Sequence, residues 1–182
     1  MIKYGTTDAE LLLLGLVAEM PRHGYELEQV IEERGMRQWT QIGFSSIYFV
    51  LGKLQKAGFV AAKKPAGPKS KKTFAITSAG REALAVQTLD ALRNVRPTYS
   101  SVLIGMIHWR TVDHGSALGA LKARKAAVTG ESERLERIRF QRQPLPDFVE
   151  ALFDFSAGQL EAEKEWITST LDYMQTKPIN GD

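Results

Sequence analysis

The lysines and arginines of this sequence are concentrated in one segment, where their positive charge could bind an anionic partner. Between Arg34 and Arg81 the chain carries ten of its 24 basic residues and none of its 21 acidic ones. The net charge of +3 hides this asymmetry, because the acidic residues are concentrated in the rest of the chain. An acid-free cationic segment attracts polyanions, of which the phosphate backbone of nucleic acid is a frequent example. The segment therefore predicts a surface for a polyanionic partner.

Two groups of side chains in this segment are candidates for contacting double-stranded DNA. The first lies on one side of residues 42–60, "IGFSSIYFVLGKLQKAGFV", and comprises Ser45, Ser46, Tyr48, Phe49, Lys53 and Lys56. The second surrounds a Pro/Gly-rich turn and comprises Lys63, Lys64, Lys69, Lys71 and Lys72. Lysines bind phosphates, and a helix in the major groove reads base edges. For the lysines of both groups, the alternative to DNA contact is a surface that is simply exposed to solvent.

Each polar or aromatic candidate also has a structural alternative. Ser45 and Ser46 could position the helix on phosphates or could cap its N-terminus. Tyr48 lies at the border of the apolar side, so its ring could belong to the core while its hydroxyl reaches a phosphate. Phe49 has only apolar contact to offer, for example to a thymine methyl group, or could pack against a partner helix or the adjacent hairpin.

Residue types that would indicate catalysis or metal binding are sparse. The chain has no cysteine, which excludes disulfides, thiolate nucleophiles and cysteine-based metal sites. His23 is interpreted as a structural histidine at the start of a helix. His108 and His114 are six residues apart with no third ligand near them in sequence. We therefore predict no enzymatic activity, no catalytic residue, no metal and no cofactor.

The N-terminal half predicts the elements that would position the candidate residues. Thr7 and Glu10 have the spacing of a capping box, and Thr77 can cap a later helix. Gly35 is expected to end the second helix, whose apolar stripe includes Tyr25. In chain order the expected elements are helices over about 8–19, 24–34 and 42–58, strands over 59–64 and 72–77, and a helix from 78 to about 95. This order is typical of a winged helix-turn-helix.

Within the third helix, period 3.6 predicts an apolar side that faces the core. Its residues are Phe44, Ile47, Val50, Leu51 and Leu54.

The C-terminal half shows no strand pattern. An apolar helix is predicted within 99–109, a long helix over about 115–143, and a last helix over about 147–176, after the turn "PLP". Two long helices joined by a short turn form an antiparallel hairpin that cannot bury both apolar sides alone. A second copy of the chain is the expected cover. The prediction is a mainly α protein with a winged-helix domain at 1–96 and a helical dimerisation domain at 97–182.

The apolar run from Leu11 to Ala18 does not predict a membrane segment or a secretory signal. Acidic residues flank it at Asp8, Glu10 and Glu19, whereas a signal peptide begins with basic residues. No other segment approaches the roughly 18 apolar residues of a spanning helix. A cytoplasmic protein without membrane contact is expected.

Residues 8–90 resemble the N-terminal domain of PadR-type transcriptional regulators. The most specific pieces are "HGYEL" at His23 to Leu27, the Ile-Tyr-x-x-Leu of the third helix and the Leu-x-x-x-Gly-x-Val that follows it. The C-terminal part resembles the virulence-activator-like subgroup, in which paired helices form the dimer interface. Two departures stand out: "GFSSIYF" replaces the frequent Pro-Gly-Thr-Leu-Tyr-Pro, and Phe74 stands where Tyr is usual.

The resemblance implies a bacterial, homodimeric regulator that binds operator DNA, with repression relieved by a small aromatic or cationic effector. Trp109 and Trp166 are the candidates for lining an effector site, although large aromatic residues in helical proteins mostly belong to the core. The alternative is a winged helix that binds another protein without contacting DNA.

Overall fold

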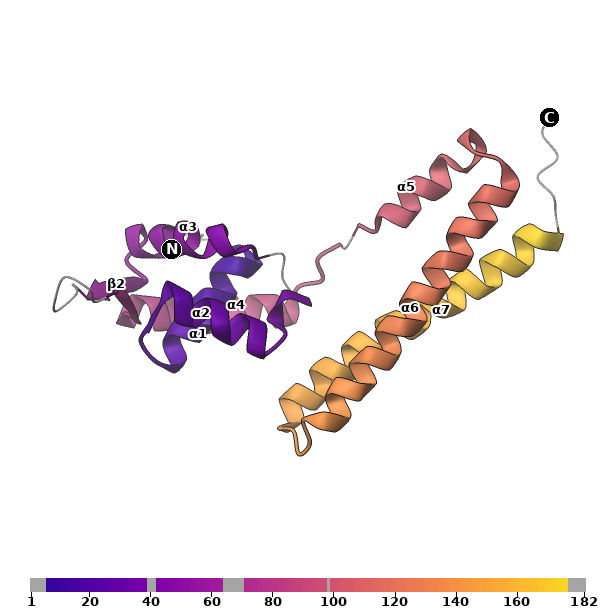
Figure 1. Ribbon diagram of the computed structural model, residues 1–182. Coiled ribbons are helices and arrows are strands. Elements are labelled where there is room, and N and C mark those ends of the chain that lie inside the picture. Colours follow the sequence, from indigo (N-terminus) through magenta and orange to yellow (C-terminus); the bar gives the residue numbers. More distant parts are fainter. Residues whose placement is uncertain (1–5, 39–41, 64–70, 98, 177–182) are drawn as a thin grey trace. The chain divides into compact units, whose positions relative to one another are not determined.

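The computed structural model describes residues 6–38, 42–63, 71–97 and 99–176, without the side chains of Phe44 and Ser45. The chain divides into two compact units, Met1–Pro97 and Thr98–Asp182 (Figure 1). The predictions made for Lys64, Lys69 and the side chains of Phe44 and Ser45 lie outside this described part. That each unit carries a separate function stays a prediction.

Helices α1 (Asp8–Glu19), α2 (Gly24–Glu33), α3 (Phe44–Lys56) and α4 (Ser78–Arg93) build the N-terminal unit, with a short 3₁₀ helix, η1, at Met36–Gln38. The predicted capping box is confirmed, since Thr7 Oγ1 accepts from the Glu10 amide and Glu10 accepts from the Thr7 amide. Thr77 caps α4 by accepting from the Gly80 amide at 3.0 Å. These local hydrogen bonds fix the helix starts because they satisfy otherwise unpaired amides.

The core of this unit lies between α1, α2, α3 and the sheet. Its buried residues are Leu13, Leu14, Leu16, Val17, Leu27, Ile31, Ile42, Ile47, Val50, Leu51, Leu54, Val60 and Phe74. The predicted apolar side of α3 is thus confirmed for Ile47, Val50, Leu51 and Leu54. Tyr25 was placed in the apolar stripe of α2, and this is wrong: its side chain is 47% exposed. Leu27 and Ile31 already supply the buried face of that helix.

A three-stranded antiparallel sheet replaces the two-stranded hairpin predicted from the sequence. Strands β2 (Val60–Lys63) and β3 (Thr73–Ile76) form the expected hairpin, with Val60 opposite Ile76. The third strand, β1 (Arg22–His23), pairs with the other edge of β3, where Arg22 lies opposite Phe74. Two residues are too few to show alternation in a sequence, so the turn after α1 gave no strand signal.

Gly24 and Gly80 allow two close approaches in this unit. A Cβ on Gly24 would lie 2.6 Å from ring atoms of Tyr48, and a Cβ on Gly80 would lie 2.1 Å from the Phe59 carbonyl oxygen. Neither contact leaves room for a side chain. The absence of a side chain at Gly24 therefore allows the ring of Tyr48 on α3 to pack against the start of α2. The absence of a side chain at Gly80 allows α4 to approach Phe59, just before the hairpin.

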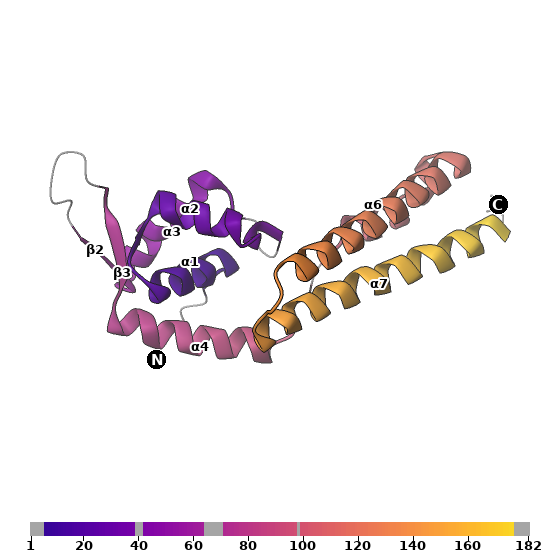
Figure 2. The same ribbon diagram turned by 60° about the horizontal axis from the view of Figure 1, so that its bottom comes forward.

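The described residues of the C-terminal unit form helices joined by short connections, without a strand. It contains α5 (Ser101–Ile107), a 3₁₀ turn η2 at Trp109–Thr111, α6 (His114–Gln141) and α7 (Asp147–Thr176). Helices α6 and α7 run antiparallel and side by side (Figures 1 and 2). Their shared core consists of Trp109, Ala117, Leu121, Val128, Ile167 and Leu171. None of the helices in the described ranges is apolar over a length that would cross a membrane.

The apolar residues of α7 do not all face α6. Phe153 is buried, although the sequence gave it no role, whereas Phe148 and Phe155 are 71% and 67% exposed. Phe140 of α6 is 82% exposed. The helical hairpin therefore leaves aromatic surface uncovered, as expected of two helices that cannot bury both apolar sides by themselves.

Candidate nucleic-acid interface

The exposed side of α3 follows from the position of its buried side. Ile47 and Leu51 point into the core, so the residues roughly opposite them face outward. Phe49 is 66% exposed and Tyr48 is 52% exposed, while Lys53 and Lys56 are also exposed. Tyr48 is thus a surface residue, not a border core residue, although one side of its ring lies against Gly24.

The two serines lie inside the first turn of α3. The N-cap is Gly43, and this cap makes no side-chain hydrogen bond. Ser46 is therefore not the N-cap residue, and the side chain of Ser45 lies outside the described part. Ser46 is partly exposed. An uncapped helix start leaves amide groups that water or an anion can satisfy, as at many phosphate sites.

Lys53 is less available than the sequence suggested. Its Nζ lies 3.5 Å from Oε1 of Glu10, whose side chain is only 5% exposed. The same ammonium lies 5.0 Å from the centroid of the Phe49 ring. Lys53 therefore neutralises a buried carboxylate of α1 and holds Phe49 at the surface, which are structural roles additional to any phosphate contact.

The described wing lysines make contacts with the helix-turn-helix. Lys72 Nζ donates to Gln55 Oε1 of α3 at 2.9 Å and lies 5.0 Å from the Phe74 ring centroid. Lys71 Nζ lies 4.7 Å from the ring centroid of Tyr25 on α2. Lys63, at the end of β2, is exposed. Lys63, Lys71 and Lys72 thus extend the cationic surface from α3 onto the β2–β3 hairpin, which is the wing. These three lysines and the exposed side of α3 together form what we call the basic face.

Two arginines at the start of the acid-free segment are paired with acids from outside it. Arg34 donates to Glu19 at 2.6 and 2.9 Å. Arg37 pairs with Glu32 at 3.0 Å and also with Glu28. The hydrogen bond from Arg34 holds the pKa of Glu19 below its usual range. Arg34 and Arg37 are therefore neutralised by acids from outside the acid-free segment, and the basic face comprises α3 and the wing.

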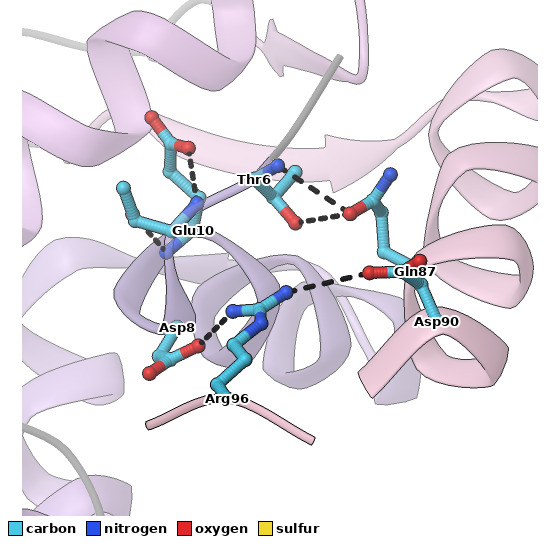
Figure 3. Close-up of polar contacts among 7 residues, drawn as sticks. Thr6, Asp8, Glu10, Gln87, Asp90 and Arg96 are labelled. Atoms are coloured by element: carbon cyan, nitrogen blue, oxygen red, sulfur yellow. Dashed lines mark hydrogen bonds and ion pairs between the residues drawn. The ribbon is translucent and has the colours of Figure 1, made fainter. Parts of the chain in front are cut away.

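A polar network at the start of α1 fixes that helix against α4, as Figure 3 shows. Thr6 Oγ1 donates to Gln87 Oε1 at 3.1 Å. Arg96 pairs with Asp8 at 3.0 Å and with Asp90 at 3.4 Å. Because Glu10 of α1 pairs with Lys53 of α3, this network also supports the position of α3.

His23 has the structural role that the sequence predicts for it, at the start of α2. His23 is the N-cap of α2: its Nδ1 accepts from the Glu26 amide at 3.1 Å, and Glu26 accepts from the His23 amide at 2.8 Å. His114 lies edge-on to Trp109. Within the described ranges, no group of three or more His, Asp or Glu side chains could hold a metal ion.

The two tryptophans proposed for an effector site lie in the C-terminal unit. Trp109 is 8% exposed and lines a hollow of about 400 Å³ together with Val102, Met106, Leu121 and Arg124. Trp166 packs against the same core but does not line this hollow. The Arg124 guanidinium is paired with Glu163 at 2.6 Å. A larger hollow of about 620 Å³ lies between α6 and α7, and its lining combines the charged residues Lys122, Lys125, Glu133 and Asp172 with Ala126 and Leu171.

The sequence analysis missed the contacts that two residues of this region, Glu10 and Tyr25, make in the folded chain. Glu10 was recognised as a capping residue, but its contact with Lys53 joins helices distant in the chain. For Tyr25 the sequence predicts a place in the apolar stripe of α2, which its exposure contradicts. A signal for Tyr25 was present, because Leu27 and Ile31 already complete a buried face for a ten-residue helix.

Comparisons with known proteins agree with this architecture. The family model "Transcriptional regulator PadR-like family" matches residues 13–86. Bacillus subtilis PadR in complex with operator DNA aligns with a TM-score of 0.70 at 18% identity, covering 91% of this chain and 98% of that one. The same protein in complex with p-coumaric acid aligns with a TM-score of 0.71 at 18% identity and the same coverage.

A further solved structure, a PadR-like transcriptional regulator from Bacillus cereus, aligns with a TM-score of 0.66 at 19% identity, covering 93% and 99% of the two chains. No curated protein sequence gave a significant match. At these identities the solved structures establish a shared fold.

Proposed function

We propose that this chain, which carries a PadR-like winged-helix domain and has the fold of PadR transcriptional regulators, is a sequence-specific DNA-binding regulator. The observation that carries the proposal is the basic face: α3 presents Tyr48, Phe49 and Lys56, and the wing lysines extend the same cationic surface. Helix α3 enters the major groove, where Phe49 contacts a thymine methyl group. Ser45, Ser46 and the lysines bind phosphates.

The protein acts as a homodimer through the C-terminal unit, residues 97–182, with residues 1–96 as the reading head. The exposed phenylalanines of α6 and α7 support this assembly because a second copy would cover them. A two-fold dimer reads two half-sites separated by one DNA turn, about 34 Å. The mode of control in this proposal is repression, in which the bound dimer blocks access to the promoter.

A small aromatic effector releases the repressor. The apolar hollow beside Trp109 supports this step, as does the p-coumaric acid bound by the Bacillus subtilis relative. The aromatic ring of the effector would fill the apolar part of the hollow, whereas a carboxylate such as that of p-coumaric acid would have to compete with Glu163 for Arg124. A ligand that prefers a different angle of the helical hairpin changes the spacing of the reading heads and weakens operator binding. Trp166 contributes by packing behind this core.

The full chain is first used to select the DNA sequences that it binds from a random pool. Its affinity for the selected sequence is then measured at a series of salt concentrations. A palindrome with half-sites one turn apart is expected, and affinity should fall steeply between about 50 and 200 mM salt. Replacing Lys56, Lys71 and Lys72 with Gln should weaken binding to every sequence. A flat salt response would contradict DNA binding and favour the alternative of a protein-interaction module, whose partner binding this triple variant would leave intact.

The effector step has its own test. Tryptophan fluorescence is measured during titration with neutral, cationic and anionic aromatic compounds, in parallel with operator affinity. A neutral or cationic compound should quench the fluorescence and weaken operator binding, and replacement of Trp109 with Leu should abolish both effects. Failure of every compound to change operator affinity would contradict regulation by an aromatic effector.

A further inference from the structure

Tyr25 occupies a surface position that the core of its helix does not explain. It lies in the first turn of α2 and is 47% exposed, whereas Leu27 and Ile31 of the same helix are fully buried. A large aromatic side chain left at the surface is informative when its neighbours are arranged around it.

Among the described residues, the side chains of His23 and Lys71 contact the Tyr25 ring. The His23 ring stacks on it, with centroids 6.3 Å apart and an interplanar angle of 29°. The Lys71 ammonium lies 4.7 Å from its centroid, within the range of a cation–π interaction. The ring therefore restrains a wing lysine whose flexible stem would otherwise sample many positions.

The neighbourhood of Tyr25 also reaches α3. Gly24, the residue before it, contacts the ring of Tyr48 so closely that a Cβ there would lie 2.6 Å from the ring. His23, the residue on the other side of Gly24, pairs through β1 with Thr73 of β3. Tyr25 thus lies where the start of α2, the wing and the outward side of α3 meet.

We propose that Tyr25 is a further DNA-contacting residue, which donates its phenolic hydroxyl to a backbone phosphate and holds Lys71 beside that phosphate. Tyrosine hydroxyls are regular phosphate ligands, and the first helix of a helix-turn-helix crosses the DNA backbone. The neutral hydroxyl of Tyr25 would fix the position of the protein along the DNA, while the ammonium of Lys71 would attract the phosphate by its charge. This inference rests on the proposed DNA binding of the basic face.

The experiment uses the full chain and the operator obtained by selection. Tyr25→Phe removes the hydroxyl but retains the ring under Lys71, and is expected to raise the Kd about three- to tenfold without changing its salt dependence. Lys71→Gln should reduce the slope of log K against log salt by about one. Tyr173→Phe, at an exposed tyrosine of α7, is the matched control and should leave the Kd unchanged.

Single methylphosphonate substitutions along the operator separate contact from structure. Each neutralised phosphate that the wild-type chain contacts weakens binding, and for Tyr25→Phe the phosphate bound by Tyr25 should give a smaller loss than it gives for wild type. A merely structural tyrosine would lower affinity equally at every substituted phosphate, and that result would overturn the inference. Equal Kd values for Tyr25→Phe and wild type would also overturn it, while leaving the proposed function intact. The proposed function fails only if the wild-type chain itself shows no salt-dependent binding.

Discussion

The two units of this protein bury their apolar residues in different ways. In the N-terminal unit three helices and a sheet enclose a core in which Leu13, Leu27 and Leu51 are completely buried. In the C-terminal unit two long helices share a narrow core, and Phe140, Phe148 and Phe155 remain exposed. A helical hairpin has only one interface, so it can cover only one stripe of each helix. The core between α1, α2, α3 and the sheet is therefore closed, whereas the helical hairpin leaves its outer aromatic residues uncovered. Helix α4 of the N-terminal unit also exposes apolar residues, namely Val86, Leu89 and Leu92.

The largest expected effect is on the closed core. Leu51→Ala should lower the free energy of unfolding of the N-terminal unit by about 2–5 kcal/mol, because it removes packed atoms and leaves a cavity. Urea denaturation followed by circular dichroism measures the change. Gln55→Ala, on the same helix but exposed, is the control and should change little. A loss below about 1 kcal/mol for Leu51→Ala would mean that the site collapses or that the core is loosely packed.

The second prediction concerns the exposed aromatic surface of α7, where added negative charge should prevent dimerisation. Phe148→Glu combined with Phe155→Glu should shift the chain from dimer to monomer, since each carboxylate would have to be desolvated at the interface. Sedimentation equilibrium gives the mass. The exposed Gln159 of α7 provides a control, Gln159→Glu, that adds charge without removing apolar surface. A double variant that keeps the mass of its parent would place the dimer contact elsewhere.

A smaller effect is expected at the contact between α1 and α3. Lys53→Met leaves the buried Glu10 carboxylate without its ammonium partner and should destabilise the N-terminal unit by about 1 kcal/mol. Lys56→Met removes an exposed lysine from the same helix and should leave stability nearly unchanged. Thermal denaturation compares the two variants. Equal melting temperatures would show that the pair contributes nothing to stability.

The smallest effect concerns pH. The folded-state pKa of Glu19 is lowered by its hydrogen bond from Arg34, so the stabilisation is present above the unfolded pKa of about 4.3 and is lost as pH falls through the folded value. The pair is partly exposed, and its contribution should stay below about 1 kcal/mol. Glu19→Gln should therefore reduce stability at pH 7 and flatten its decline between about pH 5 and 3. Unchanged acid unfolding would show that the pair is screened by solvent.

Local features of the fold could be predicted well. The starts of α1 and α4 follow from hydrogen-bonding side chains at Thr7 and Thr77, and α7 has the predicted bounds, Asp147–Thr176. These features depend on residues within one helical turn or on a regular apolar period. Strand β1 could not be predicted, because its two residues become a strand only through pairing with β3.

The sequence predicts where the candidate site lies, but it does not predict which of the basic residues there are paired with acidic residues. The acid-free segment and the outward residues of α3 located the basic face. Lys53 and Arg34, however, meet acids that lie far from them in sequence, at Glu10 and Glu19. Counting charges along a segment misses such partners, because folding brings them in from other helices.

The positions of the helices, the capping residues Thr7 and Thr77 and the buried residues Ile47, Val50, Leu51 and Leu54 of α3 follow from the sequence, since each depends on neighbouring residues or on the 3.6-residue period. Which charges are neutralised and which aromatic residues stay at the surface depends on the tertiary structure. Tyr25 illustrates the division: its helix is evident from the sequence, but its exposure and its contact with Lys71 arise from packing between α2 and the wing. Side-chain partners distant in the chain are chosen by the arrangement of whole elements, and a local pattern does not encode that arrangement.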